Sequence, residues 1–256
     1  MNLPRIVSRA EWLDARKELL AREKALTRAR DELAAARRSL PMVPVDKEYV
    51  FTGPDGPRTL LDLFDGRRQL IVHHMMWAYD VDEDGNEVPR DTGCPSCSAQ
   101  ADNIGDLVHL HQRNTSFVAV SRAPYEKIGP FHKRMGWSFP WVSSHGSDFN
   151  HDYHVTVDDR VCPVLLNYRT ADELPFAWTP ARRGDYPGMS CFLRDGDRVF
   201  HTYSTYARGL EQIGGTHYFL DMTALGRQEP WEKPEGRAAA FGAQAGSPDL
   251  RFHDEY

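Results

Sequence analysis

The first forty residues carry the most regular apolar pattern of the chain, and this pattern predicts a long helix. Ser8 and Glu11 form the Ser-x-x-Glu signature of a helix start, and Pro41 ends the pattern. The residues between them are rich in arginine and form a single apolar stripe. The stripe consists of residues that recur every seven positions, with alanines beside them: Trp12, Leu19, Leu26, Leu33 and Leu40, then Ala15, Ala29 and Ala36.

We expect this helix to lie as an arm across its own domain. The alternative is a coiled coil between two copies of the chain, which would make a homodimer. Arg22 occupies an intermediate position of the stripe and is a poor residue for the seam of a coiled coil. The pattern therefore favours the arm.

Two nearly continuous apolar runs, at 69–77 and 115–121, predict central strands that are buried on both faces. Between them, residues 80–91 predict a polar loop with six carboxylates against one arginine, Arg90. A helix is predicted from Cys94 to about Arg113, because apolar residues there recur with helical spacing. This order, strand, loop, helix and strand, is typical of an α/β protein.

The remaining pattern predicts further elements in alternation. A hairpin is expected in 49–66 with its turn at 53–56, a helix at 124–137 bent by Pro130, and a short strand at 139–144. A hairpin with strands at 189–193 and 199–203 precedes a short helix at 205–213. We expect three regions: a helical arm at 1–45, a domain at 46–225 with an insertion at about 156–186, and an irregular tail at 226–256.

Composition narrows the class of protein. Hydrophobic residues make up 41% of the 256 residues and charged residues 27%, as in ordinary globular proteins. The net charge of −6 argues against nucleic-acid binding, and no apolar stretch is long enough to span a membrane. The first twelve residues lack an apolar segment of the kind found in secretory signals. Four irregularly spaced cysteines do not form a disulfide scaffold, so we expect a cytoplasmic protein.

The candidate chemistry lies at the start of the predicted helix, in the sequence Gly93-Cys94-Pro95-Ser96-Cys97. Two cysteines three residues apart on one helical turn share a face and can close a disulfide. Unpaired N–H groups at a helix start favour a thiolate at the first cysteine. The acidic loop before Cys94 opposes a second negative charge, so we expect a mild reductant rather than a strong oxidant.

The order of elements resembles the thioredoxin fold, and 117–121, 139–143 and 153–155 resemble its peroxiredoxin-like branch. The whole chain is similar to a bacterial thioredoxin-like family of unknown function. The stretches that carry this similarity are GCPSCS-x-x-ADN, SFVAVSRAP-x-EKI, KRMGW-x-FPWVSS-x-GSDFN and HTYS-x-YARGL. The resemblance implies a thioredoxin-like fold with a central mixed sheet flanked by helices, a long N-terminal helix and an insertion before the C-terminal hairpin. It implies no established reaction.

The resemblance also places candidate residues around the dithiol. Cys94 would be the nucleophile and Cys97 the resolving thiol of a thiol–disulfide oxidoreductase, with thiol peroxidase activity as a further prediction. Pro187 takes the position of the cis-proline that faces the dithiol in thioredoxin folds, where it would present the backbone of Tyr186 to an extended substrate. Arg122 ends a central strand and would stabilise a thiolate or peroxide oxygen, although a surface ion pair is the simpler interpretation.

The expected partners are a disulfide or peroxide substrate and a thiol reductant, with no cofactor, nucleic acid or membrane. Two other classes of function stay open. The first is a copper or zinc protein that uses Cys94, Cys97 and a histidine such as His74, since thiolates suit Cu(I). The second is a redox-silent protein that binds a partner through the long helix. Cys162 and Cys191 are isolated in sequence, and Cys191 is expected to be a small buried residue in a strand.

Overall fold

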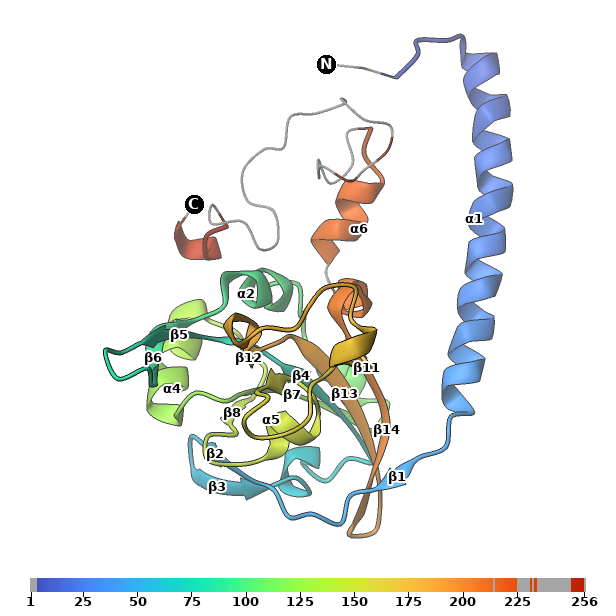
Figure 1. Cartoon of the computed structure of the whole chain (residues 1–256). Coiled ribbons are helices and arrows are strands. Elements are labelled where there is room, and N and C mark those ends of the chain that lie inside the picture. Colours follow the sequence, from blue (N-terminus) through green and yellow to red (C-terminus); the bar gives the residue numbers. More distant parts are fainter. Residues whose placement is uncertain (1–3, 214, 225–230, 232, 234–249, 256) are drawn as a thin grey trace.

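A computed structural model of the chain describes residues 4–213, 215–224, 231, 233 and 250–255 (Figure 1). Its main sheet has eight strands in the order β1-β14-β13-β4-β7-β8-β2-β3. These strands are β1 (Val43–Pro44), β2 (Val50–Gly53), β3 (Gly56–Thr59), β4 (Gln69–His74), β7 (Thr115–Ser121), β8 (Trp141–Ser143), β13 (Gly188–Asp195) and β14 (Arg198–Tyr206). β4, β7 and β8 are parallel to one another, whereas β13 and β14 run antiparallel.

The parallel strands form the centre of the sheet because their residues are apolar on both faces. All seven residues of β7 are buried, as expected for a strand covered on both sides. One face packs on η1 (Asp62–Phe64) and α5 (Phe149–Asp152), through Leu70, Val72 and Phe149. The other packs on α2 (Pro95–Ala101) and α4 (Tyr125–Met135), through Cys97, Phe117 and Phe131. This mixed sheet between two layers confirms the predicted thioredoxin-like fold.

The helix predicted from Cys94 to Arg113 is broken in the structure. α2 ends at Ala101, and a second helix, α3 (Val108–His111), begins after a connection at 102–107. This connection contains Asn103, Gly105 and Asp106, residue types that disfavour the interior of a helix. The Asp106 carboxylate accepts a hydrogen bond from the Val108 N–H at 2.8 Å, which fixes the start of α3.

The acidic segment predicted as a loop is instead a hairpin. β5 (Trp77–Val81) pairs with β6 (Glu87–Gly93), and the turn between them is closed by Asp82, which accepts hydrogen bonds from the N–H groups of Asp84 and Asn86. Gly85 adopts a φ of 82° in this turn, a conformation that glycine reaches without strain. The hairpin ends at Gly93, so Cys94 follows β6 directly.

The other predicted elements between 124 and 213 are close to those observed. α4 keeps Pro130 inside the helix and ends at Met135, and Gly136, with a φ of 65°, follows as its C-cap. The insertion contains β9 (Thr156–Val157), β10 (Leu165–Leu166), β11 (Arg169–Thr170), η2 (Ala171–Glu173), η3 (Pro180–Arg182) and β12 (Gly184–Asp185). The helix predicted at 205–213 is wrong in its first part, because β14 continues to Tyr206. A 3₁₀ segment, η4 (Ala207–Ile213), follows, and then α6 (Gly215–Asp221).

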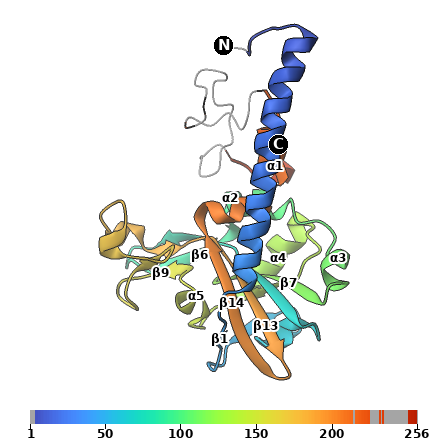
Figure 2. The ribbon, with the colours of Figure 1, turned by 90° about the vertical axis from the view of Figure 1, so that its right-hand side faces the viewer.

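The long helix α1 (Arg9–Arg38) has the predicted start, with the complete Ser8–Glu11 capping box. It does not lie across its own domain, and this expectation was wrong. No residue of α1 is buried, and Figures 1 and 2 show the helix rising away from the sheet. At its end, the Arg37 guanidinium lies 4.6 Å from the ring centre of Tyr203 in β14. The extended segment after Pro41, which includes β1, carries the helix away from the core.

Most of the tail predicted at 226–256 lies outside the described residues. The part at 250–255 includes η5 (His253–Glu255) and is docked rather than loose. Phe252 is buried beside Phe131 of α4, with ring centres 5.2 Å apart. Arg134 binds both oxygens of Asp254 at 2.7 and 2.8 Å. The last described residues therefore pack onto the same layer that carries the dithiol.

Candidate dithiol site

Cys94 is the N-cap of α2, and its position is fixed by the backbone on both sides. Its N–H donates to the Met76 carbonyl at 3.2 Å, and its carbonyl accepts from the Ser98 N–H at 3.0 Å. Pro95 occupies the first position of the helix, where a missing N–H costs nothing. The free N–H groups of the first turn therefore point toward the Cys94 sulfur. Cys94 is half-buried, Cys97 is 1% exposed, and both are reduced.

The pKa values of the two thiols are shifted in opposite directions. The Cys97 thiol donates a hydrogen bond to the Cys94 sulfur, and the backbone N–H groups of Cys97 and Ser96 donate as well. Against the opposing effect of burial, these bonds lower the pKa of Cys94 to about 6. The same bond, together with burial and the nearby Asp185, raises the pKa of Cys97 well above its ordinary value. At neutral pH the arrangement therefore provides one thiolate, at the accessible sulfur, and one protonated thiol beneath it.

The acidic segment opposes the Cys94 thiolate less than the sequence suggested, because four of its six carboxylates have partners of their own. Asp80 binds Arg90, Asp91 binds Lys127, and Asp82 closes the hairpin turn. Glu87 binds Arg122 at 2.7 Å. The main influences on the pKa of Cys94 are instead its own burial and the hydrogen bonds from Cys97 and Ser96.

A buried carboxylate that sequence reasoning missed, Asp185, lies close to Cys97. Its side chain is 4% exposed, and it accepts hydrogen bonds from Arg122 Nε at 2.9 Å and from Thr156 Oγ1 at 2.7 Å. Burial raises the pKa of Asp185 despite the lowering effect of Arg122. Asp185 comes from β12 in the insertion, far from the cysteines in sequence. In the sequence, the one sign of its location was that this carboxylate lies two residues before Pro187, the proline expected to face the dithiol.

Arg122 is held by an ion-pair cluster. Besides Asp185 and Glu87, its guanidinium carbon lies 4.5 Å from the ring centre of Tyr79 in β5. Two carboxylates thus balance its charge, and Arg122 does not donate to the Cys94 sulfur. Arg122 therefore forms ion pairs, but the pair with Asp185 is largely buried rather than at the surface. The cluster ties β12, β6 and the end of β7 together beside the dithiol.

Pro187 lies directly before β13, where Gly188 pairs with His74 at the end of β4. Met189 packs into the apolar cluster that contains Cys94 and Cys97. The backbone of Tyr186 is less available than expected, since its N–H already donates to the Val155 carbonyl at 2.7 Å. Tyr186 therefore cannot offer this donor to an extended substrate.

The two histidines of β4 point to opposite faces of the sheet. His74 lies against Phe149 and Tyr153, and its Nε2 is 2.8 Å from Ser190 Oγ. His73 lies on the other face near Phe117, and burial lowers its pKa to about 4. The structure thus does not bring His74 to the cysteines. In the described part of the chain no group of three or more histidine, cysteine or acidic residues could hold a metal ion.

Aromatic side chains cover the base of the site. Trp77 packs edge-on against Phe131 and Trp141, and its Nε1 donates to the Arg90 carbonyl at 2.9 Å. Gly93 lies against this cluster: a Cβ there would approach Phe131 to 3.2 Å. Because Gly93 has no side chain, the chain can pass close to these aromatic rings as it continues from β6 to Cys94 and α2. A dithiol at the start of a helix, above a mixed sheet, defines a thioredoxin-like protein.

The chain belongs to a bacterial protein family of unknown function (DUF899), whose family model matches residues 1–256. No curated protein matches the sequence. Its structure is similar to that of peroxidoxin BcpB from Mycobacterium tuberculosis, with 15% identity, a TM-score of 0.40, and coverage of 69% of this chain and 95% of the other. It is also similar to a mutant of PrxQ from Xylella fastidiosa, with 13% identity, a TM-score of 0.39, and coverage of 66% and 86%. A hypothetical protein from Sinorhizobium meliloti 1021 has 12% identity, a TM-score of 0.36, and coverage of 63% and 69%.

No helix in the described ranges combines the length and apolarity needed to cross a membrane.

Proposed function

We propose that this protein is a cytoplasmic thiol–disulfide oxidoreductase that uses Cys94 as nucleophile and Cys97 as resolving thiol. One observation carries the proposal: at the start of α2 the Cys97 thiol and the N–H groups of Ser96 and Cys97 donate to the Cys94 sulfur, which lowers the pKa of Cys94 to about 6. A thiolate at neutral pH is the attacking species in disulfide exchange. The buried, protonated Cys97 is held ready for the second step.

The reaction proceeds in two exchanges. The Cys94 thiolate attacks one sulfur of a substrate disulfide, forms a mixed disulfide and releases the other sulfur as a thiolate, which takes a proton from solvent. Cys97 then loses its proton and attacks the Cys94 sulfur, which releases the second substrate thiolate and leaves a Cys94–Cys97 disulfide. The substrate gains two electrons and the dithiol loses two. A separate thiol reductant returns the protein to the dithiol form.

Asp185 is the group that takes the proton of Cys97 in the second exchange. It is a buried carboxylate that interacts electrostatically with Cys97, and its raised pKa makes it a better base than an exposed carboxylate. Arg122 and Thr156 hold the carboxylate in place through two hydrogen bonds to one of its oxygens. Among the described residues, the other oxygen accepts a single long bond, 3.4 Å, from the Trp77 N–H and can take a proton.

Trapping of the mixed disulfide tests the proposal. Cys97→Ser, treated with glutathione disulfide, should accumulate one glutathione per chain at Cys94, because the second exchange is blocked. Cys94→Ser should accumulate none, and Cys191→Ser, the matched control, should form the Cys94–Cys97 disulfide like the unmodified protein. Mass mapping that places glutathione or the disulfide mainly at Cys162 or Cys191 would refute the assignment.

Thiol peroxidase activity is a further part of the proposal. In that reaction the Cys94 thiolate attacks a peroxide oxygen, forms a sulfenic acid and releases water or an alcohol, and Cys97 then condenses with the sulfenic acid to give the disulfide and water. Stopped-flow oxidation with hydrogen peroxide and with glutathione disulfide separates the two substrate classes. Faster oxidation by peroxide would assign the dithiol to peroxide reduction, and faster oxidation by the disulfide to disulfide exchange.

A further inference from the structure

The backbone that borders Cys94 on one side is the turn at 75–77, directly after β4. The Cys94 N–H donates to the Met76 carbonyl at 3.2 Å, so the turn and the nucleophile are in contact. The next N–H, that of Trp77, donates to the Asp185 carboxylate at 3.4 Å. These backbone groups of the turn are therefore bound within the protein itself and are not offered to a substrate.

The segment 184–186 borders the dithiol on another side, since its Asp185 interacts electrostatically with the resolving thiol. Here β12 pairs with β9 in antiparallel orientation, and beyond this pair the Tyr186 N–H donates to the Val155 carbonyl at 2.7 Å. Residues 155–157, which we call the insertion strand, thus lie along this segment. Extended polypeptides bind by adding a strand to a free sheet edge, and this edge is already paired.

The insertion strand is fixed by packing as well as by hydrogen bonds. Val155 is 1% exposed and Val157 2%. Val155 lies directly on the backbone after Pro187, because a Cβ built on Gly188 would come within 2.6 Å of Val155 Cγ1. The Thr156 hydroxyl donates to Asp185 at 2.7 Å. A polypeptide that replaced this strand would expose two buried valines and remove a hydrogen bond from the proposed base.

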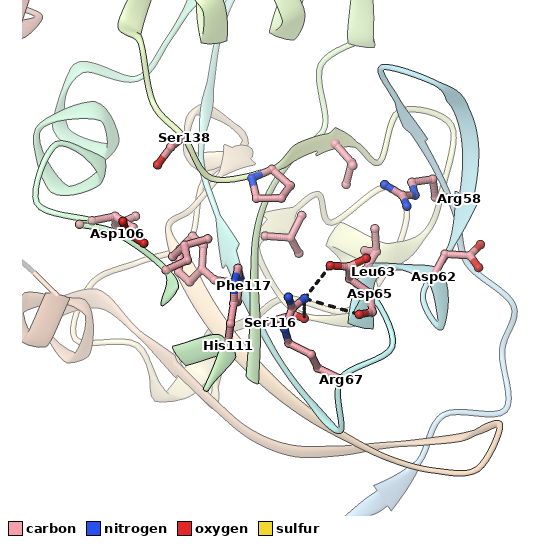
Figure 3. A pocket seen from close by; sticks show the side chains of 16 residues that line it. Arg58, Asp62, Leu63, Asp65, Arg67, Asp106, His111, Ser116, Phe117 and Ser138 are labelled. Carbon is pink, nitrogen blue, oxygen red and sulfur yellow. Dashed lines mark hydrogen bonds and ion pairs between the residues drawn. The ribbon is translucent and has the colours of Figure 1, made fainter. Parts of the chain in front are cut away.

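A cavity of about 650 Å³ lies elsewhere in the molecule and offers the substrate no alternative position (Figure 3). It is lined by residues at the starts of β7 and β8, such as Phe117 and Pro140, whereas Cys94 follows the carboxyl end of β4. A disulfide bound there would lie at the opposite end of the parallel strands from the dithiol. Exchange must therefore take place beside the turn at 75–77 and the segment 184–186.

From this geometry we infer that the dithiol acts on low-molecular-weight disulfides and not on disulfides in extended polypeptide segments. The inference rests on the proposed function and adds its substrate class. A small disulfide needs no strand pairing, only contact of one sulfur with the partly exposed Cys94. The Cys94 thiolate attacks that sulfur and releases one half of the substrate as a thiolate, and Cys97 then releases the other half, so that two electrons pass to the substrate.

Two neutral disulfides of equal chemistry test this inference. In both, a cysteine is joined to 2-mercaptoethanol: in one it is N-acetylcysteine methylamide, and in the other it is the central residue of a nine-residue peptide of alanine and serine. Mass spectrometry measures the rate at which Cys97→Ser forms mixed disulfides with each compound at Cys94. The peptide should react no more than about threefold faster than the small compound, because no strand pairing adds to its binding.

The possible outcomes separate this inference from the proposed function. A preference for the peptide greater than about threefold would overturn the substrate class and leave the dithiol chemistry intact, because backbone pairing would then contribute to binding. Reaction of Cys94 with neither compound would refute the proposed function, and the inference with it.

Gly188→Ala tests the role of the insertion strand. The added Cβ pushes against Val155, so amide hydrogen exchange at Tyr186 should rise, and the rate with the peptide should increase relative to the small compound. Val155→Ala, which removes packing without adding a group, should show the same direction of effect. Gly105→Ala, where a Cβ meets nothing within 4 Å, is the matched control and should change neither quantity. Faster exchange at Tyr186 without a change in relative rate would show that the strand does not exclude peptides, and unchanged exchange in both variants would contradict the part assigned to Val155.

Discussion

The four cysteines of the chain differ in the pKa of their thiols because their surroundings differ. Hydrogen bonds lower the pKa of Cys94 to about 6, whereas burial raises the pKa of Cys191 to about 11 and also raises that of Cys162. A thiolate is the reactive form of cysteine, so at neutral pH Cys94 is expected to be the reactive residue.

Alkylation over a range of pH measures this difference. The rate at Cys94 with iodoacetamide should rise with a midpoint near pH 6, because the thiolate fraction of Cys94 controls it. Cys97, Cys162 and Cys191 should stay unlabelled at pH 7. A midpoint near pH 9 at Cys94, or earlier labelling of Cys191, would contradict the site described above.

The same shift predicts how stability depends on pH. The pKa of Cys94 is lower in the folded than in the unfolded protein, so its contribution is fully present above about pH 9 and is lost as the pH falls through about 6. Chemical unfolding of the reduced protein at pH 5.5, 7 and 8.5 should therefore show a gain in stability with pH that Cys94→Ser lacks. Parallel profiles for the two proteins would show that Cys94 is not an acidic thiol.

Asp185 provides the test of the second exchange. Asp185→Asn removes the proton acceptor, so the mixed disulfide at Cys94 should resolve at least about tenfold more slowly at pH 7, within the usual effect of general-base catalysis. Alkylation of Cys94 should keep its midpoint, since the hydrogen bonds that lower the pKa of Cys94 come from Cys97 and Ser96. Glu87→Gln, which removes the other carboxylate on Arg122, is the matched control and should leave the resolution rate and the alkylation midpoint unchanged. Equal slowing in the two variants would assign Asp185 a structural role through Arg122.

At the scale of elements, the strands with continuous apolar runs could be predicted from the sequence. β7 was predicted with its observed bounds, because a nearly continuous apolar run such as T-S-F-V-A-V-S is typical of a strand that is buried on both faces. The β5–β6 hairpin was missed because its strands carry several charged residues and no continuous apolar run, and ion pairs such as Arg90 with Asp80 stabilise it. The dithiol could be predicted because its residues are adjacent in sequence. Asp185 could not, because only the tertiary fold brings β12 to Cys97.

The docking of residues 250–255 onto α4 makes a prediction about local stability. Phe252 is buried, and Arg134 binds Asp254 and Glu255, so these contacts should hold the segment in place. Phe252→Ala should raise amide hydrogen exchange in 250–255 to that of an unfolded peptide while the exchange of β4 and β7 stays slow. Lys133→Ala, an exposed change in the same helix, should leave the segment protected. Protection that persists in Phe252→Ala would show that other contacts hold it.

At the scale of the whole molecule, α1 exposes an apolar stripe that its own domain does not cover. Trp12 is 46% exposed, Leu26 51% and Leu33 58%, and each lies on the seven-residue repeat. Exposed apolar stripes of this length on a helix are typically covered by another helix. Since α1 does not fold back onto its own domain, the seven-residue repeat indicates a second copy of α1 as its partner.

We therefore expect the protein to form a homodimer through α1, with Arg22 extending its guanidinium to the edge of the seam. Sedimentation of the full chain should show a monomer–dimer equilibrium at micromolar concentration, and Leu26→Glu should shift it to monomer because a charge would be buried in the seam. Arg28→Glu changes charge on the opposite side of the helix and should leave the dimer intact. The dithiol lies in the other part of the chain, so Leu26→Glu should keep the alkylation profile of Cys94. A full chain that sediments as a monomer at all concentrations, or an equal effect of the two variants, would show that α1 does not pair with a second copy.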